Sequence, residues 1–168
     1  MPAGLTNLGT DLSDDHPIGF EYTSGLANQN GQLTSPATLP PEIKLDSSGQ
    51  LQCTACHDAH RNLHGAFLVM SNEFGVLCTA CHRMNGWPDC SHRTAGAAVG
   101  GAPGGDWPYG SVAENACRSC HRPHSAAGHQ DLLLFEREED NCLNCHDGQV
   151  ARTNIRGELN KATAHDPR

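Results

Sequence analysis

The sequence predicts a mostly irregular fold with short α-helices and little β-structure. Only 37% of its 168 residues are hydrophobic and 5% are aromatic, while 18 are glycine and 10 are proline. This composition offers little apolar surface for an ordinary core and many interruptions of regular structure. The pentapeptide Cys-x-x-Cys-His occurs four times. Its spacing suits one helical turn with both cysteines and the histidine on one side, so we expect a short helix at each copy.

The four pentapeptides form two pairs. They begin at Cys53, Cys78, Cys117 and Cys142, so the copies within a pair are 25 residues apart and the pairs are offset by 64. The same offset aligns His60 with His124, and residues 68–70 with residues 132–134. Agreement of these spacings indicates an internal duplication.

The repeated pentapeptide is typical of c-type haem attachment, in which two thiols are alkylated and the histidine binds iron. Zinc sites and a disulfide framework are the alternatives, but neither explains a histidine after every second cysteine. We therefore predict a chain wrapped around four covalently attached haems and largely unfolded without them. The predicted attachment residues are Cys53, Cys56, Cys78, Cys81, Cys117, Cys120, Cys142 and Cys145, and the proximal iron ligands are His57, His82, His121 and His146.

Each iron also needs a second axial ligand. Three methionines, Met1, Met70 and Met84, cannot serve four haems, so we expect bis-histidine ligation and low potentials. The preferred distal ligands are His16, His60, His92 and His124. His60 and His124 lie three residues after a proximal histidine. Each should bind a different haem from the one that the nearby proximal histidine binds, because that macrocycle would lie between it and the far face of the iron.

Three further histidines lie outside the motifs. His64 and His129 are interpreted as surface histidines, because the offset of 64 places glycine at the equivalent positions. His165 is a fifth distal candidate, so one ligand is spare or one serves another subunit. His16 and His165 both lie near chain ends, where a segment can reach across an interface.

The chain is expected to divide into four segments within one compact unit. Residues 1–50 are predicted to be an extended arm broken by prolines, and 51–90 the first dihaem repeat. Residues 91–112 are predicted to be a Gly-rich linker, and 113–168 the second dihaem repeat and tail. Ser111 and Glu114 resemble a capping box that opens the helix of the third motif.

Charge and hydropathy narrow the partners and the compartment. The net charge of −8 argues against nucleic acid, and no stretch approaches the roughly 20 apolar residues of a membrane helix. Arginines near the motifs could pair with haem propionates. Because haem c is attached outside the cytoplasm, we expect an exported protein whose leader is absent from this sequence. Cys90 is the one cysteine of nine that lies outside the pentapeptides, and it is interpreted as an incidental thiol or an intermolecular disulfide partner.

The order of these motifs resembles a known family. His16-Pro17, two Cys-x-x-Cys-His-x-x-His segments, Ser91-His92 and the two remaining pentapeptides are similar to doubled-motif multihaem cytochromes c. Within them, the resemblance over residues 11–165 is greatest to tetrahaem subunits of extracellular cytochrome filaments, such as outer-surface cytochrome E of metal-reducing bacteria. The resemblance implies bis-histidine haems and one distal histidine donated by a neighbouring subunit, here His16 or His165.

The resemblance implies electron transfer through four closely packed haems, in an extracellular homopolymer that delivers electrons to redox proteins or external acceptors. The alternative is a discrete periplasmic tetrahaem shuttle, whose negative surface would steer it to basic partners. A multihaem reductase would need an open iron position, which the surplus of histidines argues against. We therefore predict an electron-transfer protein rather than an enzyme.

Overall fold

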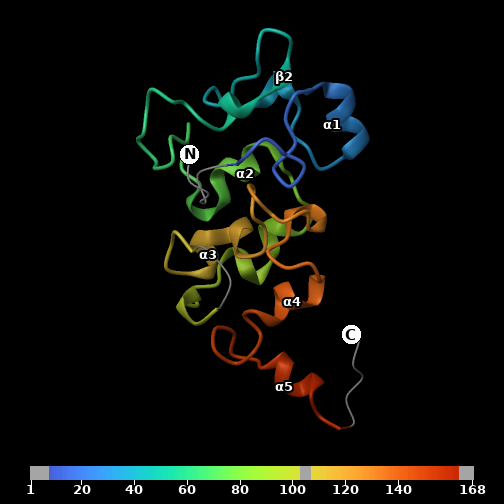
Figure 1. The fold of residues 1–168 in the computed structure, drawn as a ribbon, viewed down its shortest axis with the longest axis vertical. Coiled ribbons are helices and arrows are strands. Elements are labelled where there is room, and N and C mark those ends of the chain that lie inside the picture. The colour runs from blue at the N-terminus through green and yellow to red at the C-terminus, as the bar shows by residue number, and fades with distance from the viewer. Residues whose placement is uncertain (1–7, 103–106, 163–168) are drawn as a thin grey trace. The chain divides into compact units, whose positions relative to one another are not determined.

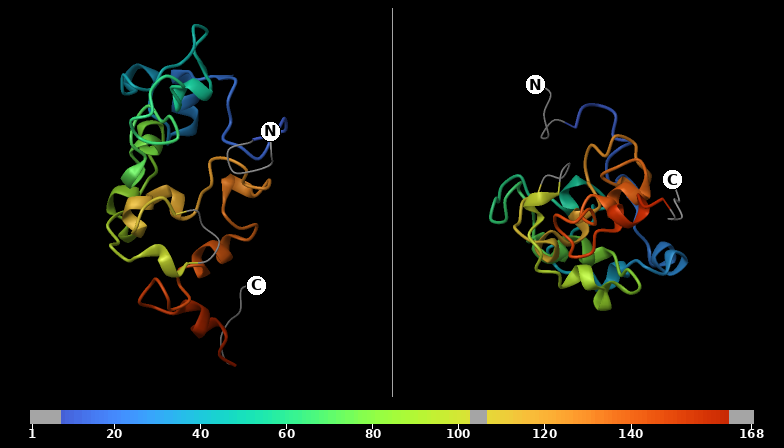
Figure 2. Two further views of the ribbon diagram at one scale, coloured as in Figure 1. Left: turned by 60° about the vertical axis from the view of Figure 1, so that its left-hand side comes forward. Right: turned by 90° about the horizontal axis from the view of Figure 1, so that it is seen from below.

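The computed structural model describes residues 8–102 and 107–162, and most of this chain is loop (Figure 1). Short helices and one two-stranded sheet interrupt the loops, as the further views show (Figure 2). The prediction of an irregular fold with short helices and little β-structure is confirmed. The described chain divides into two compact units, one of residues 17–94 and one that combines 8–16 with 95–102 and 107–162.

The unit of residues 17–94 contains the sheet. Strand β1 (Phe20–Glu21) pairs antiparallel with β2 (Gln50–Leu51), with Phe20 opposite Leu51. Helix α1 (Ser24–Asn30) begins where the Thr23 side chain accepts a hydrogen bond from the Leu26 N–H at 3.1 Å. It ends at Gly31, whose φ of 75° suits glycine. The other helices are η1 (Pro36–Thr38), η2 (Cys53–Ala55), η3 (Glu73–Gly75), α2 (Val76–Cys81), η4 (Trp87–Asp89) and η5 (Ser91–Arg93).

A small hydrophobic core holds this unit together. Its buried members are Tyr22, Ile43, Leu51 and Ala55. The Tyr22 hydroxyl donates to the Thr34 carbonyl at 2.8 Å, which satisfies the one polar group of that side chain. Residues 17–50, expected to be part of an extended arm, supply strand β1, helices α1 and η1, and two core side chains. They fold back because Tyr22 and Ile43 bury their apolar surface against the segment that carries the first motif.

The second unit is also built from short helices. They are η6 (Val99–Gly101), α3 (Val112–Asn115), η7 (Ala116–Ser119), η8 (Gln130–Leu132), α4 (Glu138–Leu143) and α5 (Ile155–Leu159). The predicted capping box is confirmed: the Ser111 hydroxyl accepts from the Glu114 N–H at 3.3 Å, and the Glu114 carboxylate accepts from the Ser111 N–H at 2.8 Å. It opens α3, and the third motif follows on the adjoining η7. No helix in the described part of the chain is long and apolar enough to cross a membrane.

Candidate functional site

All four pentapeptides close the same backbone hydrogen bond. In each one, the histidine N–H donates to the carbonyl of the first cysteine, at 3.0 Å for His57, 2.9 Å for His82, 2.9 Å for His121 and 3.0 Å for His146. This i to i−4 hydrogen bond is the helical one. Residues i, i+3 and i+4 of such a turn share one side, an arrangement that suits two thiols and an imidazole binding one group.

The thiols of the motifs are not consumed by disulfides. No disulfide joins any of the nine cysteines, all of which lie in the described ranges. Desolvation raises the pKa of the Cys120 thiol to about 11, although the residue keeps an exposed surface, and three neighbouring thiols add to the shift. Burial also raises the pKa values of Cys56, Cys81 and Cys145. At neutral pH these four groups are thiols rather than thiolates.

The first histidine of each pair has a fixed tautomer. The Nδ1 atom of His57 lies 2.9 Å from the Ala66 carbonyl oxygen, and that of His121 lies 2.8 Å from the Asp131 carbonyl oxygen. A carbonyl only accepts hydrogen bonds, so Nδ1 carries the proton in both rings. The lone pair of the neutral imidazole then lies on Nε2, the atom that could bind iron.

A returning loop supplies both of these carbonyls. After the first motif, Ala66 and Phe67 adopt φ values of 46° and 57°, and after the third motif Asp131 and Leu132 adopt 54° and 57°. These left-handed pairs turn the chain back onto its own motif. Equivalent backbone hydrogen bonds close the two loops. In the first, the Asp58 N–H donates to the Phe67 carbonyl at 2.8 Å and the Val69 N–H to the Cys56 carbonyl at 3.0 Å. In the second, the Arg122 N–H donates to the Leu132 carbonyl at 2.7 Å and the Leu134 N–H to the Cys120 carbonyl at 2.9 Å.

The backbone pairing corrects the register of the duplication. His57 is bridged to Leu68 and His121 to Leu133, so the offset in this region is 65 rather than 64. The second loop is one residue longer, and the offset returns to 64 at the next motif. His64 and His129 therefore occupy equivalent positions, contrary to the sequence comparison. A histidine four residues before the bridged leucine in both loops is the pattern that could have shown this.

The ring of His129 is held as the proximal rings are. Its Nδ1 lies 3.0 Å from the Leu133 carbonyl oxygen, and the side chain is partly buried. His64 is exposed. His129 is thus an ordered histidine beside the third motif rather than an unconstrained surface residue.

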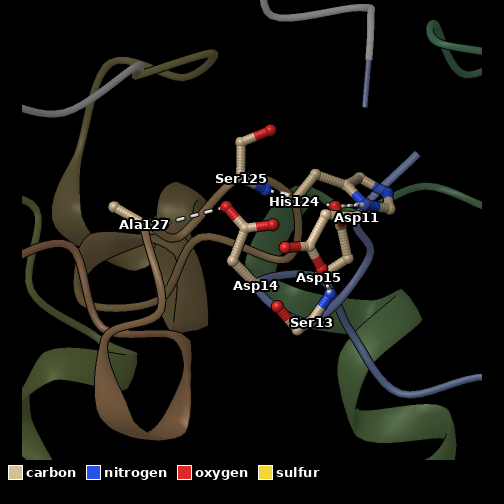
Figure 3. A network of polar contacts seen from close by, with 7 residues as sticks. All are labelled: Asp11, Ser13, Asp14, Asp15, His124, Ser125 and Ala127. Carbon is tan, nitrogen blue, oxygen red and sulfur yellow. Dashed lines mark hydrogen bonds and ion pairs between the residues drawn. The ribbon is translucent and has the colours of Figure 1, made fainter. Parts of the chain in front are cut away.

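The preferred distal ligands lie in different surroundings. The ring of His124 is held in place, because its Nδ1 lies 2.9 Å from the Asp15 carboxylate (Figure 3). The His16 backbone N–H donates to the Pro123 carbonyl at 2.8 Å, which brings the segment of His16 beside that of His124. His60 and His92 are exposed. The fifth candidate, His165, lies outside the described residues.

Two buried asparagines shape the approach to the third and fourth motifs, and the sequence did not indicate their role. The Asn115 amide donates to the Tyr109 carbonyl at 2.9 Å and accepts from the Tyr109 N–H at 3.4 Å. Asn141 makes the same pair of contacts with Phe135, both at 3.2 Å. Each side chain closes a loop immediately before the motif's first cysteine, and so fixes where the helical turn begins.

The residues around the motifs fit covalent haem. Two thiols and an Nε2 lone pair on one helical turn form the donor set that the cofactor requires. Asn144, inside the fourth motif, is buried, and neither polar atom of its amide has a hydrogen-bond partner in the described chain. It could contact a polar group of the cofactor. Phe67, Phe74 and Val76 beside the first pair are 47%, 53% and 44% exposed, apolar surface that a porphyrin could cover.

A zinc site would require several ligating side chains close together. Across residues 8–102 and 107–162, no group of three or more histidine, cysteine, aspartate or glutamate residues could hold a metal ion.

Comparison with known proteins agrees with this chemistry. The doubled CXXCH motif family matches residues 47–86 and 110–151, which include all four motifs and both returning loops. No curated protein and no solved structure matches the chain. The family match supports a multihaem c-type cytochrome, with covalently bound haem and a role in electron transfer.

Proposed function

We propose that this chain is a tetrahaem electron-transfer protein that assembles into an extracellular filament. The observation that supports four haems is the repetition of one local geometry. In all four motifs the histidine N–H closes a helical turn on the first cysteine, and neither thiol is part of a disulfide. A zinc or disulfide protein would not need this turn four times.

The proposed ligand set follows from these turns. His57, His82, His121 and His146 are the proximal ligands, and the distal ligands are His16, His60, His92 and His124. When bound, haem iron supplies reversible one-electron exchange at a potential set by its axial ligands and surroundings. The chain contributes attachment through the cysteines and, at His57 and His121, a fixed imidazole tautomer. No substrate pocket or reaction step is required of it, which favours a conductor over an enzyme.

The filament is supported by the resemblance of the motif order to filament subunits and by the surplus of histidines. In this proposal the neighbouring subunit receives one axial ligand from His16 or His165. A subunit completed only by its neighbour would polymerise because assembly satisfies an iron. The protein would then act at the cell surface, where a polymer can connect cell and acceptor.

The test begins with the native, exported protein. Intact mass and pyridine haemochrome absorbance should give four haems per chain, and fewer would contradict the tetrahaem proposal. Negative-stain electron microscopy of the same sample, with haem absorbance following the particles, should show regular filaments. Small monodisperse particles across salt and protein concentration would refute the filament and support the periplasmic shuttle.

Variants at the termini locate the shared ligand. His16→Ala and His165→Ala should each be compared with His64→Ala, a matched change at an exposed histidine. One terminal variant should shorten or abolish filaments while His64→Ala does not. Filaments of normal length from both terminal variants would refute ligand exchange between subunits.

A further inference from the structure

We propose that Asp15 is a positioning residue for His124, and that its carboxylate lowers the reduction potential of the one haem that His124 ligates. This inference rests on the proposed function, since it requires His124 to bind iron. It concerns a residue that is neither a predicted ligand nor part of a haem motif.

The Asp15 carboxylate contacts the imidazole directly. Its Oδ1 accepts from His124 Nδ1 at 2.9 Å and from the Ser125 N–H at 3.1 Å (Figure 3). A carboxylate that accepts from Nδ1 leaves the lone pair of the neutral ring on Nε2. Asp15 thus selects the tautomer that can bind a metal and fixes the plane of the ring.

The carboxylate is held in a poorly solvated place. Asp15 is only 7% exposed, and its second oxygen, Oδ2, is buried with no hydrogen-bond partner in the described chain. The His124 side chain, by contrast, is 40% exposed and can present its far edge to another group. A buried negative charge with few donors acts strongly on the ring beside it, because little water screens the interaction.

The neighbouring residues keep Asp15 in register with His124. The Asp14 backbone carbonyl accepts from the Ala126 N–H at 2.9 Å, and the Asp14 carboxylate accepts from the Ala127 N–H at 3.2 Å. The His16 N–H donates to the Pro123 carbonyl at 2.8 Å. With the two contacts of Asp15, five hydrogen bonds join residues 14–16 to residues 123–127. The contacts of Asp14 and His16 hold the backbone of Asp15 beside the loop, so the carboxylate leaves the ring only if its own two hydrogen bonds break.

The electronic consequence has a definite sign. Hydrogen bonding of Nδ1–H to a carboxylate makes the imidazole a stronger donor. The stronger donor and the negative charge both favour the oxidised iron, which carries one more positive charge than the reduced iron. Removing the charge from Asp15 should therefore raise the potential of that haem.

The duplicated histidine lacks this arrangement. His60 is equivalent to His124 in the sequence, but Asp58 Oδ1 accepts from its backbone N–H at 3.0 Å rather than from its ring. No hydrogen bond between the His60 ring and a carboxylate is present in the described chain. The proposal therefore separates two haems that the duplication alone would make alike.

Asp14 offers a matched control for Asp15. Both are aspartates that contact the same loop, but only Asp15 touches an imidazole. Asp15→Asn and Asp14→Asn remove the same charge, one residue apart. In haem-loaded protein we expect four attached haems and bis-histidine electron paramagnetic resonance signals from both variants. Potentiometric titration should show one midpoint potential raised in Asp15→Asn and all four retained in Asp14→Asn.

Three results would overturn the proposal: equal shifts in the two variants, no shift in Asp15→Asn, or the same shift when Asp15→Asn is combined with His124→Ala. Amide hydrogen exchange at Ser125 and Ala127 measures how firmly the loop is anchored, and both variants should increase it. A merely structural role for Asp15 would predict this increase but not the shift of a single midpoint potential. A wild-type protein without four bis-histidine haems would instead refute the proposed function.

A second measurement does not depend on Asp15→Asn folding. His124→Ala and His60→Ala each identify the haem that loses its bis-histidine signal. In the wild-type titration, the haem assigned to His124 should have the lower potential of the two. The reverse order would overturn the proposal.

Discussion

Replacing Asn115 should destabilise the approach to the third motif more than any exposed asparagine would. The side chain is 0% exposed and donates to the carbonyls of Tyr109 and Ser111 at 2.9 Å and 2.7 Å. Asn115→Ala removes these two hydrogen bonds, worth about 1 kcal/mol each. It also removes the longer one, at 3.4 Å, that the amide oxygen accepts from the Tyr109 N–H. The Ser111 carbonyl still accepts from the Asn115 backbone N–H at 3.1 Å. The partly buried Tyr109 carbonyl loses the amide donor, at a further cost of roughly 1 kcal/mol. The free energy of unfolding should fall by about 3 kcal/mol.

Guanidinium unfolding of haem-loaded protein, followed by far-ultraviolet circular dichroism, measures this loss. Asn115→Asp preserves the size of the side chain but sets a carboxylate against two carbonyls, so it should cost at least as much as Asn115→Ala. Asn28→Ala is the exposed control, with an expected change within about 0.5 kcal/mol. If the free energies of unfolding of Asn115→Ala and Asn28→Ala lie within that margin of each other, the Asn115 hydrogen bonds contribute nothing and the reasoning is wrong.

Three other changes have defined outcomes. Tyr22→Phe removes the donor to the Thr34 carbonyl at 2.8 Å and should lower the free energy of unfolding by about 1 kcal/mol in the same assay. Because burial raises the pKa of Tyr22 from 10.0 to about 12, the stability contributed by its hydroxyl should be complete below pH 10.0 and lost as pH rises towards 12, and Tyr22→Phe should lack this loss. Gly148→Ala should lower the melting temperature, because φ is 95° there and a Cβ would lie 2.9 Å from Asn154 Nδ2; an unchanged melt would contradict the close approach. His16→Ala should retain four attached haems but change one from bis-histidine ligation, and an unaltered low-spin spectrum would remove His16 from the ligand set.

The sequence predicted what depends on local spacing. The helical turns of the four motifs and the capping box at Ser111 need only residues three or four positions apart, so their geometry follows from the chain itself. The strands around Phe20 and Leu51 are two residues long, too short for alternation to be recognised. Their pairing depends on the packing of Tyr22 and Ile43 against Leu51 in one hydrophobic cluster.

The contacts missed by sequence reasoning join distant residues or depend on insertions. Asp15 and His124 are 109 positions apart, and nothing in either local sequence indicates the other. The equivalence of His64 and His129 was hidden because one extra residue in the second loop shifts the register and a later deletion restores it. Asn115 and Asn141 look like ordinary polar residues, because their partners are backbone groups that carry no side-chain identity.

The loops that return to His57 and His121 also bear on how this protein can diverge. The acceptors at positions 66 and 131 are main-chain carbonyls, which every amino acid possesses. A mutation there changes the side chain but cannot delete the acceptor, provided that the left-handed turn survives. The two copies already differ, with Ala66-Phe67 in one and Asp131-Leu132 in the other. Selection can thus alter the surface beside each proximal histidine, in polarity or bulk, while the proton stays on Nδ1.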